Sequence, residues 1–406
     1  MSMRQKYFVA QKKIKKGLKR FEIGSEKKRD SIMKSFFYVF AVCPLILGTF
    51  HIMAAEGEPD DILNLKGPTG SILLVSQKHL DFIKQSETRK NDKSAVWHDV
   101  MKPPRRGTEN SHPATVEYSW TLPPDADRAC FVIAGGGDVI RQDVTGKNHV
   151  SIGNLKIGCS YICCIEVRLK NGKLIRKGVA LYTRDQVPRW IRMPDASNVR
   201  DIGGWKTADG KYKIRQGLLY RGGEFDKGAR LTAEGERVIA EVLKLKTDID
   251  LRTFWGIEGG LSEYPLKKMG VRQILLPFSP TDYGKPGSKK NIAALFHLLA
   301  DRSIYPAYCH CAGGADRTGA AMFLLEAVLG LADEDLFTEY ELTSFSKYGK
   351  RTRNGKIFQI LIRKLNEYGS GSDPYRKKAE AYLLDIGVPR ADLESLRNIF
   401  LEKIFQ

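Results

Sequence analysis

The sequence predicts an α/β domain, built on a central and mostly parallel sheet with helices on both faces, preceded by an all-β sandwich. Three observations support this fold class. Residues 115–186 alternate apolar and polar side chains, as half-buried strands do. Residues 187–406 alternate short apolar runs with longer helical patterns, which is typical of βα units. A glycine-containing loop at 310–319 lies between one apolar run and an apolar helix.

The charge of the chain is concentrated at its N-terminus. The net charge is +19, and residues 1–55 hold 12 Lys and Arg against 3 Asp and Glu. The rest of the excess is spread over the remaining chain, without a basic cluster interleaved with aromatic side chains. A nucleic-acid partner is therefore not expected, although the isoelectric point alone would allow one.

Residues 33–55 have the pattern of a secretory signal, with a lysine, an uncharged apolar run and small residues near the end. They predict export, to the periplasm or the cell surface, with Met33 as the true start of translation. The alternatives are an uncleaved anchor over residues 35–55, which would associate the chain with a membrane, a lipoprotein site at Cys43, and a buried helix.

Residues 56–114 carry weaker patterns. Ile72–His79 predicts a strand, Leu80–Gln85 a short helix, and Arg89–Arg106 a polar loop. The next segment, 115–186, is expected to be a separate β domain, and a linker around Pro188 leads into the α/β domain at 187–406.

The β domain is predicted from a period-two pattern. Tyr161, Cys163, Ile165, Val167 and Leu169 fall on one face of a strand. The run from Leu155 through Gly158 to Tyr161 resembles the approach to a tyrosine corner, and Trp120 would fill the core of such a sandwich. The segment therefore resembles a fibronectin type III or immunoglobulin domain. It would serve either as a docking module for a protein partner or as a structural appendage.

The cysteine spacing suits no metal site, and the strand pattern predicts buried free thiols in the β domain rather than disulfides.

In the α/β domain, buried strands are expected at Lys246–Leu251, Arg272–Pro277 and Tyr305–Cys309, the last being the central strand. An amphipathic helix is expected at Asn291–Arg302. Further helices are expected at 319–330, 333–346, 354–367 and 374–386, and near 391–404.

The loop at 310–319 carries the chemistry. Cys311 and Arg317 are separated by five residues, whose backbone N–H groups could surround three phosphate oxygens at a helix N-terminus. The planar guanidinium of Arg317 would bind two of those oxygens. The same positive field favours a Cys311 thiolate as nucleophile. Thr318 would donate its hydroxyl to the departing thiolate, or else satisfy backbone at the helix start. The phosphate-binding set is Ala312, Gly313, Gly314, Ala315, Asp316, Arg317 and Thr318.

The loop reads H-C-A-G-G-A-D-R-T-G and resembles the bacterial group of cysteine-dependent protein tyrosine phosphatases, whose signature is H-C-x-x-G-x-D-R-T-G. Three other segments resemble that group: Asn198–Gly204 (NVRDIGG), Tyr220–Gly223 (YRGG) and Ile249–Thr253 (IDLRT). The resemblance implies hydrolysis through a cysteinyl-phosphate, with phosphotyrosine as substrate and with no metal or cofactor. Ala315 stands where many members have lysine, which makes highly phosphorylated substrates less favoured.

An aspartate is the usual general acid of this superfamily, and the sequence offers three. Asp282 lies in a loop 29 residues before Cys311 and resembles the acid of a mobile loop. Asp316 lies inside the phosphate loop and would need no moving lid. Asp250 stands at a strand end, where Arg252 could pair with it.

Two other functions remain open at this point. A phosphoinositide or inositol phosphate would suit a basic chain, so the substrate is a phosphorylated protein, a small molecule or a lipid head group. A protein that only binds phosphorylated ligands is the alternative from another class. An intact Cys311 and Arg317 favour an enzyme.

Overall fold

The computed structural model describes residues 62–86, 109–225, 231–253 and 266–404, and residues 63–406 form one compact unit. The predicted signal at 33–55 and the whole of the loop at Arg89–Arg106 lie outside the described residues. No helix in the described part of the chain is long and apolar enough to cross a membrane.

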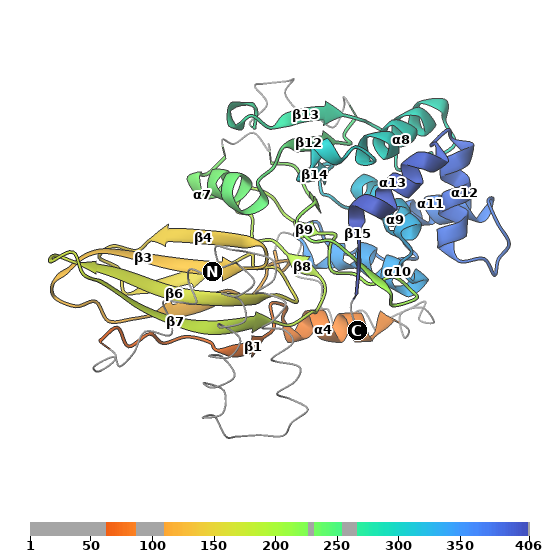
Figure 1. Cartoon of the computed structure of the whole chain (residues 1–406). Helices are drawn as coiled ribbons and strands as arrows, with labels where there is room; N and C mark the ends of the chain where they lie inside the picture. The colour runs from red at the N-terminus through yellow and green to blue at the C-terminus, as the bar shows by residue number, and fades with distance from the viewer. Residues whose placement is uncertain (1–61, 87–108, 226–230, 254–265, 405–406) are drawn as a thin grey trace, which may run out of the picture. The chain divides into compact units, whose positions relative to one another are not determined.

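Residues 70–183 form a five-stranded sheet and a smaller two-stranded sheet (Figure 1). The larger sheet has the order β1-β7-β6-β3-β4, and the smaller pairs β2 with β5. The bounds are β1 Gly70–Ile72, β2 Val116–Ser119, β3 Ala126–Gly135, β4 Asp138–Asp143, β5 His149–Ile152, β6 Ser160–Leu169 and β7 Leu174–Thr183. One core joins the two sheets. In it Trp120 stacks on Phe131, with 5.6 Å between ring centroids.

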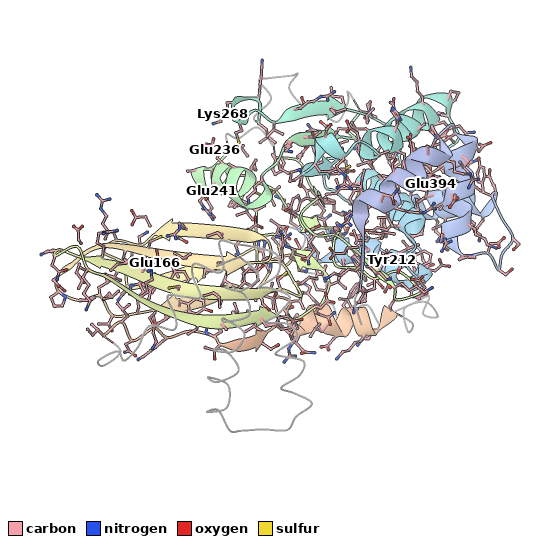
Figure 2. All side chains as sticks on the ribbon, in the orientation of Figure 1. Glu166, Tyr212, Glu236, Glu241, Lys268 and Glu394 are labelled. Atoms are coloured by element: carbon pink, nitrogen blue, oxygen red, sulfur yellow. The ribbon has the colours of Figure 1, made fainter. Side chains whose placement is uncertain are left out.

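The period-two pattern of β6 corresponds to its burial. Tyr161, Cys163, Ile165 and Val167 are buried, and Leu169 is half-buried at the strand end. On the outer face, Glu166 of β6 (Figure 2) forms ion pairs of 2.8 Å with Arg176 on the neighbouring strand β7 and with Arg141 on β4, beyond β3. The six described cysteines are free thiols, although three of them are only half-buried.

The strand expected at Ile72–His79 is wrong, and so is the helix start expected at Leu80. The strand β1 ends at Ile72, and helix α4 (Gln77–Lys84) begins well before Leu80. The reason is a capping box: the Ser76 hydroxyl accepts from the His79 amide (3.4 Å), and the His79 ring accepts from the Ser76 amide (3.2 Å). A histidine replaces the usual Glu or Gln of this motif.

The α/β prediction is confirmed by a six-stranded sheet of order β13-β12-β14-β11-β9-β8. Strands β11, β14, β12 and β13 pair in parallel, whereas β9 and β8 pair antiparallel at one edge. The bounds are β8 Arg189–Trp190, β9 Arg200–Asp201, β11 Leu219–Gly222, β12 Thr247–Asp250, β13 Arg272–Leu275 and β14 Ala307–His310. The strand β14 is therefore central, as expected.

Helices cover both faces of this sheet. The central strand shows the division, because Ala307 and Cys309 pack into one core and Tyr308 into another. The smaller core includes η1 (Val238–Leu243), which continues the short helix α7 (Ala233–Arg237). The larger includes α8 (Pro286–Leu299), α9 (Asp316–Leu329), α10 (Asp333–Glu341), α11 (Lys356–Asn366), α12 (Tyr375–Asp385) and α13 (Arg390–Phe400). Glu236 on α7 pairs with Lys268 on η3 (Lys267–Met269), beside Glu241 (Figure 2).

The helix expected near 391–404 is too long. It ends at Phe400, and Leu401–Lys403 form β15, paired antiparallel with β10 (Tyr212–Ile214). The Arg215 amide donates to the Phe400 carbonyl (2.7 Å), and the Arg215 guanidinium donates to the Ile399 carbonyl (2.6 Å). These donors satisfy carbonyls at the helix end, and the chain leaves as a strand.

Candidate active site

The loop from Cys311 to Ala315 joins the central strand β14 to helix α9. It therefore lies at the carboxyl edge of the parallel strands, where α/β proteins bind their ligands. Gly314 is in the left-handed region (φ +60°), and a Cβ there would overlap the backbone of Gly222. Only glycine fits this position. Cys311 is 4% exposed, at the strand end, and α9 directs its first N–H groups towards the loop.

Two of the family-like segments meet beneath this loop. The Asn198 side chain donates to the carbonyls of Gly313 (3.1 Å) and Gly314 (3.0 Å). The Arg221 guanidinium also donates to the Gly314 carbonyl. Asn198 and Arg221 are fully buried. Because the carbonyls are held from below, the N–H groups of the loop remain available to an anion above it.

Glu339 on α10 orients these donors. Its carboxylate accepts from Arg200 (2.7 Å) and from Arg221 (2.8 Å), and Arg200 in turn donates to Asn198 Oδ1 (2.5 Å). Burial would raise the pKa of Glu339, but the two guanidinium groups lower it below its ordinary value. The phosphate loop therefore rests on a buried, charged and hydrogen-bonded network.

Asp201, the third polar residue of the NVRDIGG segment, has a structural role. Its carboxylate accepts from the Gly203 amide (2.8 Å), the Gly217 amide (2.6 Å) and the Arg189 guanidinium (2.6 Å).

Arg317 and Thr318 occupy the first turn of α9. Arg317 is half-buried, and its Nη1 donates to the Leu251 carbonyl (3.3 Å). The Thr318 hydroxyl is fully buried and has no hydrogen-bond partner among the described residues. The backbone hydrogen bond expected as one alternative for Thr318 is thus absent there. A buried hydroxyl without a partner is costly, so this one is suited to donate to a thiolate or an oxyanion.

The structure places the three candidate acids in different surroundings. Asp316 forms a two-bond ion pair with Arg351, at 2.9 Å to Nε and 3.1 Å to Nη2. Asp250 is fully buried and bonded to Arg252, which also donates to Glu224 (2.7 Å). Burial would raise the pKa of Asp250, but the His310 charge and the Arg252 hydrogen bond lower it.

Asp282 has a side chain that is 33% exposed. It accepts from the amides of Gly284 and Lys285, each at 3.0 Å, and forms a 3.4 Å ion pair with the Lys285 ammonium. The neighbouring Tyr283 is buried, and burial raises the pKa of Tyr283. The nearby groups Tyr340, Asp316, Tyr382 and Cys311 raise this pKa further. The loop that carries Asp282 thus contributes Tyr283 to the hydrophobic core that also contains Cys311.

His310 precedes the nucleophile and faces away from it into a charged pocket. Its Nε2 lies 3.2 Å from Asp248, and its Nδ1 lies 3.4 Å from the Cys311 carbonyl. Burial would lower the pKa of His310, but the Asp248 carboxylate outweighs burial and raises it to about 9. His310 is consequently a cation at neutral pH, close behind the nucleophile.

Several residues of the site were not singled out from the sequence. Glu339 and Arg351 stand far from the signature in the chain, and no pattern marks them. Glu224 directly follows the YRGG segment, and that position was the available signal. The described residues contain no cluster of three or more His, Cys, Asp or Glu side chains that could hold a metal ion.

Comparisons with known proteins identify the family of the chain. A match to the tyrosine phosphatase family covers residues 191–402, just over half of the chain. A Cupriavidus necator protein named putative tyrosine-protein phosphatase is 28% identical, over 36% of this chain and 59% of the relative. The chain thus spans less than two thirds of this curated relative.

Two solved structures are also similar. The core catalytic domain of the PP-IP phosphatase SIW14 from S. cerevisiae, in complex with citrate, has 19% identity and a TM-score of 0.27, covering 37% of this chain and 85% of that one. PTPMT1 in complex with PI(5)P has 13% identity and a TM-score of 0.28, covering 42% and 97%.

The α/β region and the loop at its central strand define the class of cysteine-dependent phosphatases. Within that class, the chain belongs to the tyrosine phosphatase family. The predicted family is thereby confirmed.

Proposed function

We propose that this chain hydrolyses phosphate monoesters through a cysteinyl-phosphate, with phosphotyrosine as the substrate. The observation that carries the proposal is the position of Cys311, at the end of the central strand and at the start of a loop whose carbonyls accept hydrogen bonds from Asn198 and Arg221. This arrangement leaves the loop N–H groups and Arg317 to bind the phosphoryl group. The H-C-x-x-G-x-D-R-T-G signature supports the bacterial group of the family.

The reaction has two steps. The Cys311 thiolate attacks phosphorus, the ester P–O bond breaks, and the leaving oxygen takes a proton from a general acid. Water then attacks phosphorus, the P–S bond breaks, and inorganic phosphate leaves. Arg317 and the loop N–H groups stabilise the equatorial oxygens in both transition states. Thr318 donates its free hydroxyl to the sulfur as it departs.

Asp282 is the general acid that the surroundings favour. Asp316 and Asp250 are each held by an arginine through more than one bond, whereas Asp282 is partly exposed and held by its own turn. Its present hydrogen bonds lower its pKa, and burial opposes them. Movement of the loop towards a bound ester would release the Gly284 and Lys285 amides and favour the protonated form.

The test is phosphate release from a phosphotyrosine peptide, a phosphoserine peptide, a phosphoinositide and inositol hexakisphosphate, with Cys311→Ser as control. Turnover of the tyrosine peptide alone supports the proposal. Preference for an inositol substrate would assign the alternative, a phosphoinositide or inositol phosphate phosphatase. Tight binding without turnover on any substrate would assign a phospho-ligand binding protein.

We also propose that residues 115–186 are a fibronectin III-like sandwich that supports the catalytic domain at 187–406. Tyr161 supports this fold, because its hydroxyl accepts from the Lys156 amide (2.9 Å) as a tyrosine corner would. The loop held in this way makes six hydrogen bonds to the α/β region, two each with Gln216, Arg192 and Arg189. The alternative is that this domain docks a protein partner. Capture of a protein that binds the outer face of the β domain would favour that alternative.

Finally, we propose export through the signal at residues 33–55. N-terminal sequencing of the native protein checks this. A mature chain that begins near residue 56 supports export, and one that retains residues 12–19 would contradict it.

A further inference from the structure

The segment that precedes β2 contacts residues that lie next to the supports of the phosphate loop. Its last described stretch begins at Glu109, outside the part of the chain that matches the family. The Asn110 amide donates to the Phe345 carbonyl (2.8 Å), and the Asn110 carbonyl lies 3.2 Å from His79 Nε2. Helix α4 continues this contact, since the ring centroids of His79 and Phe345 are 4.3 Å apart.

Glu109 joins three parts of the chain. Its carboxylate accepts from the Ser197 hydroxyl, from the Lys347 amide (3.3 Å) and from the amide (3.0 Å) and hydroxyl of Ser111. Ser197 precedes Asn198, which holds the phosphate loop, and its carbonyl accepts from the Gly223 amide (2.8 Å). The Glu109 side chain thus links Lys347 to Ser197 and so to Asn198, which holds the carbonyls of Gly313 and Gly314.

The residue after Lys347 is Tyr348, and its aromatic ring packs against the phosphate loop. A Cβ on Gly313 would lie 3.0 Å from Cγ of Tyr348 and 3.1 Å from its Cδ1. A Cβ on Gly223 would lie 3.3 Å from Cε2 of the same ring. The ring therefore rests on two glycines, one of them only two residues after Cys311, and remains half-exposed. Burial raises the pKa of Tyr348, and Glu224, Cys311 and Glu109 raise it further.

Tyr348 lies in a loop that runs from Lys347 to Arg351, and both ends of this loop are anchored. Glu109 holds it at Lys347, and the ion pair of Arg351 with Asp316 holds it at the other end. The Arg351 amide also donates to Ser344 (2.9 Å). The Lys347 ammonium lies 5.7 Å from the centre of the Tyr348 ring.

We propose that Glu109 is a positioning residue of the active site, and that it holds the Tyr348 ring as a wall contacting the organic group of an aryl phosphate. This inference rests on the proposed function, and it names the determinant of its substrate class. An aromatic wall favours a flat apolar ring. A polyhydroxylated ring would lose hydration there without gaining matching hydrogen bonds.

The test compares Glu109→Ala, Tyr348→Ala and the double variant of the full chain, with phenyl phosphate as substrate and inorganic phosphate as inhibitor. Each single variant should raise KM for phenyl phosphate about three- to tenfold, since ring contacts are worth roughly that much. The inhibition constant of inorganic phosphate should stay constant, because Asn198 and Arg221 still hold the loop.

The double variant separates positioning from general stability. If Glu109 acts through Tyr348, the double variant has the KM of Tyr348→Ala alone. Tyr348→Phe should restore most of the wild-type KM, and Glu109→Gln should restore part of it. Glu117→Ala is the matched control, because Glu117 also accepts from a serine (Ser151, 2.5 Å) but lies on β2. Additive KM effects, or equal weakening of inorganic phosphate, would overturn the inference.

A binding experiment tests the inference separately from the proposed function. Calorimetry of phenyl phosphate and inorganic phosphate is made on Cys311→Ser chains with and without Tyr348→Ala. Weaker binding of phenyl phosphate alone supports the wall even if the wild-type enzyme turns over no ester. Turnover by the wild type with unchanged binding in Tyr348→Ala would reject the wall and leave the proposed function standing.

Discussion

Arg221 and Glu339 form a fully buried ion pair, with 2.8 Å between Nη1 and Oε2, directly under the phosphate loop. The same guanidinium reaches the Gly314 carbonyl through its other terminal nitrogen. A residue of α10 thus supports the backbone of the phosphate loop through Arg221. The stability of the fold and the geometry of the candidate site consequently depend on one charge.

Glu339→Gln should therefore destabilise the protein and impair catalysis together. Removing one partner of a buried ion pair typically costs about 3–5 kcal/mol of unfolding free energy, because the other charges stay buried. Here Arg200 and Arg221 would lose their carboxylate partner, and the phosphate loop would lose its fixed position. We therefore expect kcat/KM to fall at least about tenfold. Urea denaturation and steady-state kinetics measure both effects.

The control for this variant is Glu394→Gln on α13, where the side chain is exposed (Figure 2). It should change the unfolding free energy by less than about 0.5 kcal/mol. Wild-type stability and activity in Glu339→Gln would show that the buried pair supports neither.

This pair also marks the limit of what the sequence predicts. The signature loop, the central strand and the helices after it could be predicted, because each depends on local periodicity and on glycines near the motif. Glu339 could not, since its role arises from contact with Arg221, 118 positions away. The segments around Asn198 and Arg221 were located by resemblance, but only the fold shows that they hold the loop carbonyls. Glu109 and Tyr348 lacked even that signal.

The general acid can be identified by the leaving group. With phenyl phosphate the leaving oxygen needs a proton, so Asp282→Asn should lower kcat about 10²- to 10⁴-fold. With a p-nitrophenyl ester, whose leaving group is stable as an anion, the loss should be much smaller. Asp316→Asn should affect both esters alike, since Asp316 anchors Arg351.

The reverse pattern, in which Asp316→Asn alone shows this selectivity, would assign the acid to the phosphate loop. Asp250→Asn serves as the third comparison. It should destabilise the protein, because it leaves the buried Arg252 with one acidic partner fewer.

The stability of the protein should fall as the pH rises through the titration of His310. The pKa of His310 is about 9 in the folded protein and has a reference value of 6.5 when unfolded. The stabilising charge is thus fully present below pH 6.5 and is lost by about pH 9, which corresponds to roughly 3 kcal/mol. Thermal unfolding between pH 6 and pH 10 measures this slope. In His310→Asn the same decline should be absent, and an identical decline in the variant would assign the slope to other groups.

The contact between Gln216 and the β region should stabilise the whole chain. Gln216 accepts from the Ile157 amide (3.0 Å) and donates to the Ile157 carbonyl (2.8 Å), and Ile157 is buried. Gln216→Ala leaves both backbone groups without these partners, at a cost of about 1–3 kcal/mol each. Chemical denaturation should show this loss, with Gln142→Ala on the exposed edge strand β4 as the control. Because Gln216 precedes β11, which carries Arg221, kcat/KM should fall as well. A loss of stability with unchanged kinetics would instead mean that the β region supports the fold without influencing the site.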